Sequence, residues 1–234
     1  MSVDAHDTGS GELSASVAAT LAAAEIPPSK LGPARRARLS QSERELYFWI
    51  LRQFASDGGP SSAELRAAAE ELGLEADSAL ATLAREDLVH RGADGEIAVA
   101  YPFSGTPTAH RVRFPDGPEV DAMCAIDALG IAPMFGKAIE IESRDPMSGD
   151  AIHARVAPDA PLEWTPESAV VVAGAIRSQG DASCGCCPVL NFFASAATAE
   201  RWLAEHPEAR GTSISMREAA AAGRAVFGDV LTAT

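Results

Sequence analysis

The chain has few cysteines and no long apolar run, and we expect no leader segment. Four cysteines in 234 residues are too few for a disulfide-stabilised scaffold. No run of about 18 or more apolar residues occurs, so we expect no transmembrane helix. Residues 1–7 are polar and acidic, and they lack the basic start and apolar core of a secretory signal. We therefore expect a cytoplasmic protein with no membrane partner, whose thiols stay reduced.

Positive charge is also scarce. The chain has 19 Lys and Arg against 33 Asp and Glu, which gives a formal net charge of −14. Nucleic-acid phosphates repel such a surface unless one face is locally basic, so we expect no nucleic-acid partner. A short basic run at residues 35–38 is interpreted as a solvated linker or docking segment rather than a binding site.

Three regions of different character follow one another. Residues 1–40 are rich in Ser, Ala, Gly and Pro, and we expect a flexible segment with a short helix at 14–24. Residues 41–103 show three helix patterns and a hairpin on an Asp-Gly turn, which predicts a winged-helix-like subdomain. Residues 104–234 mix short strand patterns with helices. The predicted fold class is α+β, with a mixed sheet and flanking helices in the last region.

Local signals predict the element boundaries. Ser42 with Glu45, and Ser61 with Glu64, have the spacing of capping boxes that begin helices. Apolar residues at helical spacing predict a helix over 122–135. Strands are expected at 89–91, 97–101, 138–142, 151–156, 170–173 and 189–193, and further helices at 76–86, 198–206 and 217–231.

The first cysteine has an acidic neighbour. Asp127 follows Cys124 by three residues, and on a helix this spacing places both side chains on nearly the same face. A thiol becomes a nucleophile or a soft-metal ligand when it loses its proton, and a nearby carboxylate takes and returns that proton. The alternative is a buried cysteine beside an aspartate with a local structural role.

The other three cysteines, Cys184, Cys186 and Cys187, lie within four residues before an expected strand. Zinc binding is disfavoured, because Cys-x-Cys-Cys with one distant cysteine is not a usual zinc spacing. Two other interpretations stay open. One is a redox disulfide between Cys124 and the cluster, and the other is a soft-metal centre with one thiolate from each segment.

Three segments carry a family resemblance: Ala100–Ser104 (AYPFS), Met123–Leu129 (MCAIDAL) and Cys187–Ser195 (CPVLNFFAS). From about residue 98 to residue 229 the chain resembles the organomercurial lyase (alkylmercury lyase) family, whose N-terminal winged-helix region is similar as well. The resemblance implies cleavage of a carbon–mercury bond by protonolysis, giving a hydrocarbon and Hg(II), in mercury detoxification. It also implies two catalytic cysteines and one catalytic aspartate.

The resemblance assigns these roles residue by residue. It matches the first catalytic cysteine to Cys124, the aspartate to Asp127 and the second cysteine to Cys187, with Cys186 as the runner-up. The same three side chains are expected to hold the Hg(II) product. No cofactor is implied. The implied partners are organomercurial substrates, small cytosolic thiols and a mercuric reductase that receives the ion.

The chain departs from the family pattern at three places. Met123 stands where familiar members have tryptophan, and a structural cysteine is replaced around Asp145. Cys184 is additional, and a relay of mercury through it is an open question. These departures leave the chemistry intact but leave the preference for alkyl or aryl substrates open.

The aspartate has to protonate carbon at neutral pH. We therefore expect a raised pKa for Asp127, produced by an apolar environment. His110 and Asn191 lie near the motifs in sequence and are expected to make only structural hydrogen bonds. Apolar walls around Asp127 are expected from Leu129, Met134, Phe192 and Phe193.

Two other functions stay open. A winged-helix regulator would sense mercury or another metal through its thiols, and a thiol oxidoreductase would form a reversible Cys124–Cys187 disulfide. The carboxylate three residues after Cys124 fits a lyase better, since a sensor needs only ligands and an oxidoreductase usually has a Cys-x-x-Cys pair. Acidic side chains around the expected recognition helix also disfavour DNA binding: Glu70, Glu71, Glu75 and Asp77.

Overall fold

The computed structural model describes residues 14–27, 31–176, 185–228 and 230–231. These residues form eight helices and eleven strands, which confirms the predicted α+β class. Residues 1–13 of the predicted N-terminal segment lie outside the described residues. Within the described ranges, no helix combines the length and apolar character needed to cross a membrane.

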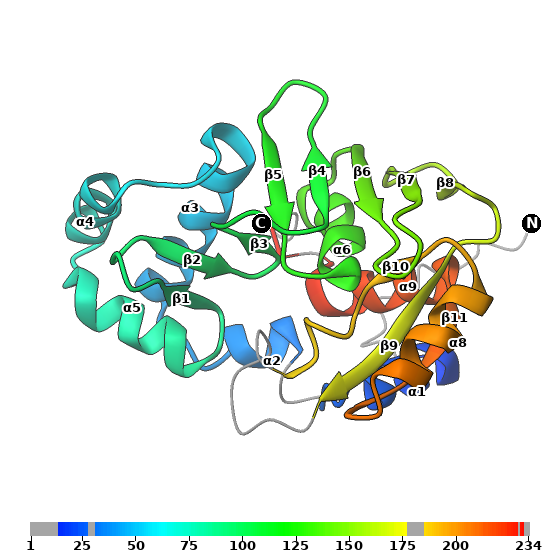
Figure 1. Cartoon of the computed structure of the whole chain (residues 1–234). Coiled ribbons are helices and arrows are strands. Elements are labelled where there is room, and N and C mark those ends of the chain that lie inside the picture. Colours follow the sequence, from blue (N-terminus) through cyan, green and yellow to red (C-terminus); the bar gives the residue numbers. More distant parts are fainter. Residues whose placement is uncertain (1–13, 28–30, 177–184, 229, 232–234) are drawn as a thin grey trace, which may run out of the picture.

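Eight strands form one antiparallel sheet in the order β1-β2-β3-β5-β4-β6-β7-β8 (Figure 1). In β6, Ile139 and Ile141 are buried while Glu140 and Glu142 are exposed, because one face of the strand meets the core and the other meets solvent. The bounds are β1 Val89–Arg91, β2 Ile97–Ala100, β3 Phe103–Ser104, β4 Arg111–Arg113, β5 Glu119–Ala122, β6 Ile139–Arg144, β7 Ala151–Val156 and β8 Glu163–Thr165.

A second sheet has three strands. β9 (Val170–Ile176) pairs with β10 (Phe192–Phe193) on one side and with β11 (Ala209–Ser215) on the other. The predicted strand at 189–193 is wrong in its length, because the chain turns at Cys186 and only Phe192 and Phe193 pair with β9 as a strand. The prediction missed β11, because its sequence lacks an alternating apolar pattern. Pairing along the whole of β9 holds this strand in place.

Three consecutive helices lie directly before the large sheet in the chain. They are α3 (Gln41–Asp57), α4 (Ser62–Glu71) and α5 (Ala76–Arg85). The capping box at Ser61 is confirmed, whereas the one predicted at Ser42 is wrong. Ser40 caps α3 with Glu43, because Ser-x-x-Glu occurs twice in this stretch and the earlier copy lies at the helix end.

The hairpin β1–β2 does not stand apart from the following region. It joins the large sheet through the pairing of β2 with β3. A single buried cluster also runs from Val17 in α1 to Val230. The winged-helix description and the boundaries at residues 40 and 103 stay predictions.

The predicted helix at 14–24 is present as α1 (Ala15–Ala23), with Ser14 as its N-cap. It buries Val17 and Leu21 and packs against α9 (Met216–Phe227). A short helix, α2 (Gly32–Arg36), follows, and α8 (Ala196–Glu205) covers the small sheet. In Figure 1, α3–α5 lie at one end of the molecule and the small sheet at the other.

Two glycines bring α6 (Ala125–Phe135) and α9 close together. A Cβ atom added to Gly223 would lie 2.8 Å from the carbonyl oxygen of Ile126 and 2.9 Å from the backbone nitrogen of Gly130. These neighbours are backbone atoms, so they cannot turn away as a side chain does. The contact therefore fixes the position of the helix that carries Asp127.

Gly223→Ala is expected to lower the free energy of unfolding by about 1–3 kcal/mol, the usual cost of overpacking. The sign of this change in free energy is informative, because replacing glycine by alanine inside an exposed helix normally stabilises the protein by about 1 kcal/mol. Urea unfolding followed by circular dichroism measures it, with Ala221→Ser at an exposed position of α9 as the matched control. An unchanged or higher free energy of unfolding in Gly223→Ala would contradict the close packing.

Candidate active site

The two cysteine segments meet at the beginning of α6. Cys124 is the N-cap of this helix, and the next backbone N–H, that of Ala125, donates to the carbonyl oxygen of Leu190 at 2.8 Å. The carbonyl oxygen of Cys186 accepts from the N–H groups of Val189 and Leu190, which closes a turn in the second segment. These bonds hold the turn with Cys187 against the first turn of α6.

Cys124 precedes the helix rather than lying in it. Its backbone is extended, with φ −157° and ψ 177°, and the residue before Met123 still pairs in β5. The helix predicted from residue 122 therefore begins three residues later, at Ala125. Cys124 and Asp127 meet all the same, because the Cys124 Sγ accepts from the Asp127 N–H at 3.4 Å, as N-cap side chains do.

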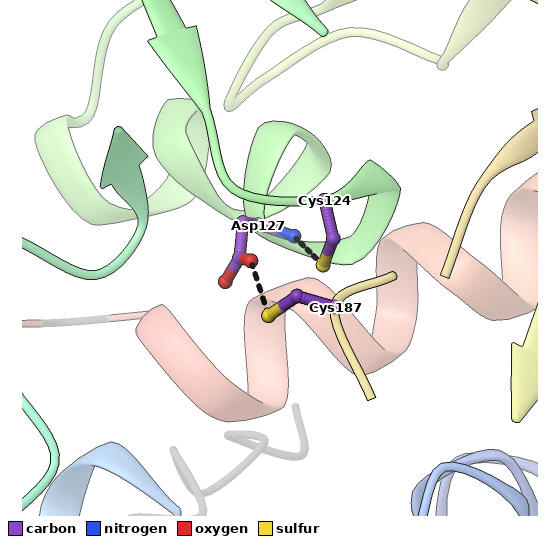
Figure 2. A group of neighbouring side chains, drawn as sticks. All are labelled: Cys124, Asp127 and Cys187. Atoms are coloured by element: carbon purple, nitrogen blue, oxygen red, sulfur yellow. Dashed lines mark hydrogen bonds between the residues drawn. The ribbon is translucent and has the colours of Figure 1, made fainter. Parts of the chain in front are cut away.

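Cys124, Asp127 and Cys187 point toward one another (Figure 2). The two sulfur atoms and a carboxylate oxygen all lie within 4.8 Å of one another. The Cys187 thiol donates to Asp127 Oδ2 at 3.8 Å, and all three residues are buried. Cys186 is buried next to this triad but is not part of it, and Cys184 lies outside the described residues. The catalytic and mercury-binding roles stay predictions.

Burial controls the protonation of the triad. It raises the pKa of Asp127 to about 7, although hydrogen bonds from both thiols and the charge of Arg35 oppose the rise. Burial also raises the pKa of Cys124 to about 12. A hydrogen bond to Cys124 raises the pKa of Cys187 well above its usual value, and burial adds to the rise. Near neutral pH the thiols keep their protons, while Asp127 is partly protonated.

A cavity opens onto the triad. Tyr47, Arg35 and Cys186 line it together with the triad, and much of the remaining wall is apolar: Ile26, Leu88, Ile126, Leu190, Val226 and Phe227. The expected walls were wrong, because none of the four predicted residues lines this cavity: Leu129, Met134, Phe192 and Phe193. The two phenylalanines pair with β9, and all four side chains are buried in the core.

His110 and Asn191 have structural partners, as predicted. His110 Nδ1 lies 3.0 Å from Ser143 Oγ, and the ring meets Phe192 edge to face at 5.5 Å. Burial lowers the pKa of His110 to about 4, so the ring is neutral at neutral pH. The Asn191 amide donates to the carbonyl oxygen of Pro188 at 2.8 Å, inside the turn that presents Cys187.

Asp145 links two distant parts of the chain. Its carboxylate is buried and accepts from the N–H groups of Met147 at 2.7 Å and Ala194 at 2.8 Å. Burial alone would raise the pKa of Asp145, but hydrogen bonds from Thr198 and from these N–H groups lower it. The carboxylate thereby ties the β6–β7 turn to the residue that follows β10.

Arg35 is a site residue that sequence reasoning missed. The prediction of a solvated linker is wrong for it, since only 8% of the residue is exposed. Its guanidinium donates to the carbonyl oxygen of Asp87 at 2.5 Å and pairs with the Asp87 carboxylate at 3.3 Å. The available signal for this site residue was a basic run in an acidic chain. The burial of Arg35, however, depends on Asp87, which lies 52 residues away in the sequence.

Comparison with known proteins gives a consistent result. A family model described as alkylmercury lyase matches residues 103–228. Alkylmercury lyase of Staphylococcus epidermidis is 28% identical over 171 residues, which cover 72% of this chain and 77% of that protein. Alkylmercury lyase of Bacillus cereus is 32% identical over 118 residues, which cover 50% of this chain and 53% of that protein.

The fold has a solved counterpart as well. A crystal structure of the mercury-bound form of MerB2 superposes with a TM-score of 0.69 and 22% identity, over 85% of this chain and 96% of that one. At this identity the likeness concerns the fold. The family model, however, spans more than half of the 234 residues and includes all three members of the triad. The chain therefore belongs to the alkylmercury lyase family.

Proposed function

We propose that this protein cleaves the carbon–mercury bond of organomercurials by protonolysis, releasing a hydrocarbon and Hg(II) in mercury detoxification. The observation that carries the proposal is the convergence of two thiols and a carboxylate within 4.8 Å beside a cavity. Thiolates bind soft cations tightly, and an acid with a pKa near neutrality donates a proton well. Cleavage of the carbon–mercury bond needs thiolates that bind mercury and an acid that donates a proton, both at one place.

The first step is thiol exchange. The organomercurial arrives as an adduct of a small cytosolic thiol, and Cys124 or Cys187 displaces this carrier. The mercury–sulfur bond to the carrier breaks, a mercury–sulfur bond to the protein forms, and the proton of the protein thiol ends on the carrier sulfur. Mercury takes the place of the proton because a soft cation prefers sulfur.

The second step brings the other thiol to mercury. Its proton passes to Asp127. Where Cys187 is this second thiol, the distance of 3.8 Å from its Sγ to Asp127 Oδ2 gives a direct path. Two sulfur donors increase the electron density on the bonded carbon. Asp127 then delivers its proton to that carbon, the carbon–mercury bond breaks, and the hydrocarbon leaves.

The protons and electrons balance without a cofactor. Two thiol protons enter the sequence, and one leaves with the carrier thiol while the other leaves in the hydrocarbon. Hg(II) stays on the two sulfurs and an Asp127 oxygen. Small cytosolic thiols or a mercuric reductase then remove the ion and return the protons.

The proposal is tested by headspace gas chromatography of reduced protein incubated with phenylmercury or methylmercury and excess thiol. Benzene or methane is expected from the wild type. Cys124→Ser and a protein-free sample are the controls, and both should release only background hydrocarbon. If mercury binds stoichiometrically but no hydrocarbon forms, the lyase proposal fails and a sensing or sequestering function takes its place.

A further inference from the structure

The cavity beside the triad has positive charge in its wall, although the chain as a whole is acidic. Arg35 and Arg36 both line it. Arg35 is more than nine-tenths buried, and within the described part of the chain its Nε has no hydrogen-bond partner. A buried donor without an acceptor is unfavourable, so this N–H is suited to an acceptor supplied by a ligand.

The acidic groups near Arg35 leave its Nε without an acceptor in the described part of the chain. Asp87 pairs with Arg35 but occupies the other guanidinium nitrogens, not Nε. Glu25 also lines the cavity, with an exposed side chain. Among the described residues that line the cavity, the one other carboxyl group is that of Asp127, which accepts from the Cys187 thiol. An anion that enters the cavity therefore meets the Arg35 guanidinium group, whose Nε–H no described residue engages.

We propose that Arg35, together with Arg36, binds the carboxylate of the thiol that carries the organomercurial, so that adducts of carboxylate-bearing thiols are the preferred substrates. This inference rests on the proposed function. The Nε–H of a guanidinium group donates to a carboxylate in a charge-assisted hydrogen bond, which is roughly twice as strong as a hydrogen bond to a neutral acceptor. The reaction also requires the carrier sulfur to come next to Cys124 or Cys187, in the cavity that Arg35 lines.

The carrier carboxylate takes no part in bond breaking. During exchange the mercury–sulfur bond to the carrier breaks, the bond to the protein sulfur forms, and the thiol proton moves to the carrier sulfur. The carboxylate keeps its charge and leaves with the carrier. Arg35 therefore affects capture of the adduct, while the later protonation of carbon proceeds with the carrier gone.

The test compares two carriers that differ in charge. Phenylmercury is supplied as its adduct with 3-mercaptopropionate or with the methyl ester of that acid, each as the sole thiol in excess. Benzene release gives kcat/KM for each adduct. The ratio of acid to ester, compared between protein variants, cancels the different leaving abilities of the two sulfurs and any general damage to the protein.

Arg35→Gln is expected to lower this ratio about tenfold, the effect of one charge-assisted hydrogen bond. The single-turnover rate of benzene release after exchange should be the same for both carriers. Arg36→Gln should lower the ratio as well. Arg38→Gln is the matched control, because Arg38 pairs with Glu86 and does not line the cavity, and its ratio should equal that of the wild type.

Separate outcomes would overturn this inference and the proposed function. If Arg35→Gln slows both adducts equally, Arg35 acts only as the structural partner of Asp87 and the inference is wrong. If wild type releases no benzene from either adduct, the proposed function itself fails. Should Arg35→Gln not fold, Arg36→Gln and added salt acting on wild type replace it, and a ratio insensitive to both would overturn the inference.

Discussion

Cys187→Ser is expected to lower hydrocarbon release by about a thousandfold or more, in line with the loss of a reacting nucleophile. Cys186→Ser is expected to keep the rate within about threefold of the wild type, a change of well under 1.4 kcal/mol. The two cysteines are almost equally buried, at 6% and 7% exposure, so accessibility does not separate them. Position separates them, since the Cys187 sulfur lies in the triad and donates to Asp127.

Serine is the right replacement at both positions. Its hydroxyl is close in size to a thiol and forms hydrogen bonds, but oxygen is a hard ligand and holds mercury poorly. Benzene from phenylmercury is measured by headspace gas chromatography under single-turnover conditions, with circular dichroism to confirm that both variants are folded. Loss of release in Cys186→Ser with retention in Cys187→Ser would show that the assignment must move by one residue.

Asp127→Asn is expected to lower hydrocarbon release by about a hundredfold to ten-thousandfold, the range of a general acid–base group. The amide keeps the shape of the side chain but neither accepts the thiol proton nor delivers it to carbon. Both thiols remain, so the variant should still bind phenylmercury stoichiometrically. Titration of bound mercury beside headspace analysis separates the two effects, and normal release by Asp127→Asn would exclude Asp127 as the proton donor.

The same variant should change how stability depends on pH. Burial raises the pKa of Asp127 from 3.8 to about 7 in the folded protein. Between about pH 4 and pH 7 the folded state keeps a proton that the unfolded state has lost, so wild-type stability falls as pH rises through this window. Below the window both states are protonated, and above it the loss is complete.

Asp127→Asn removes this titration. Relative to the wild type, the variant should therefore gain stability between about pH 5 and about pH 8. Urea unfolding of both proteins at the two pH values, with a thiol reductant present, measures the difference. A difference between variant and wild type that is the same at both pH values would show that Asp127 is not held protonated by burial.

The sequence allowed much of the triad to be anticipated, but not its surroundings. The raised pKa of Asp127 was expected and burial is its cause, yet the predicted apolar walls were wrong. Spacing alone brought Cys124 and Asp127 together, whereas the choice of Cys187 came from the family resemblance. Which apolar residues face them depends on how α6 packs on α9 and on which residues pair in β10, and these contacts join distant parts of the chain.

Boundary errors have local causes. Ser40 and Ser42 both have glutamate three residues later, so sequence spacing alone does not choose between two capping boxes. Cys124 is an unusual N-cap residue, so the sequence does not mark where the helix begins. The apolar pattern continues through Cys124, and the predicted helix therefore began at residue 122, before the observed first residue Ala125. The burial of Arg35 depends on Asp87, and no periodicity near either residue signals the contact.

The burial of Cys124 and Cys187 also determines which reagents the protein withstands. Alkylating agents and disulfides react with thiolates, and these two groups stay protonated at neutral pH. Hard divalent cations prefer oxygen ligands and do not displace thiol protons readily. The pair is therefore expected to react slowly with disulfides and with hard divalent cations, whereas a soft cation such as mercury, the proposed substrate, is expected to displace its protons.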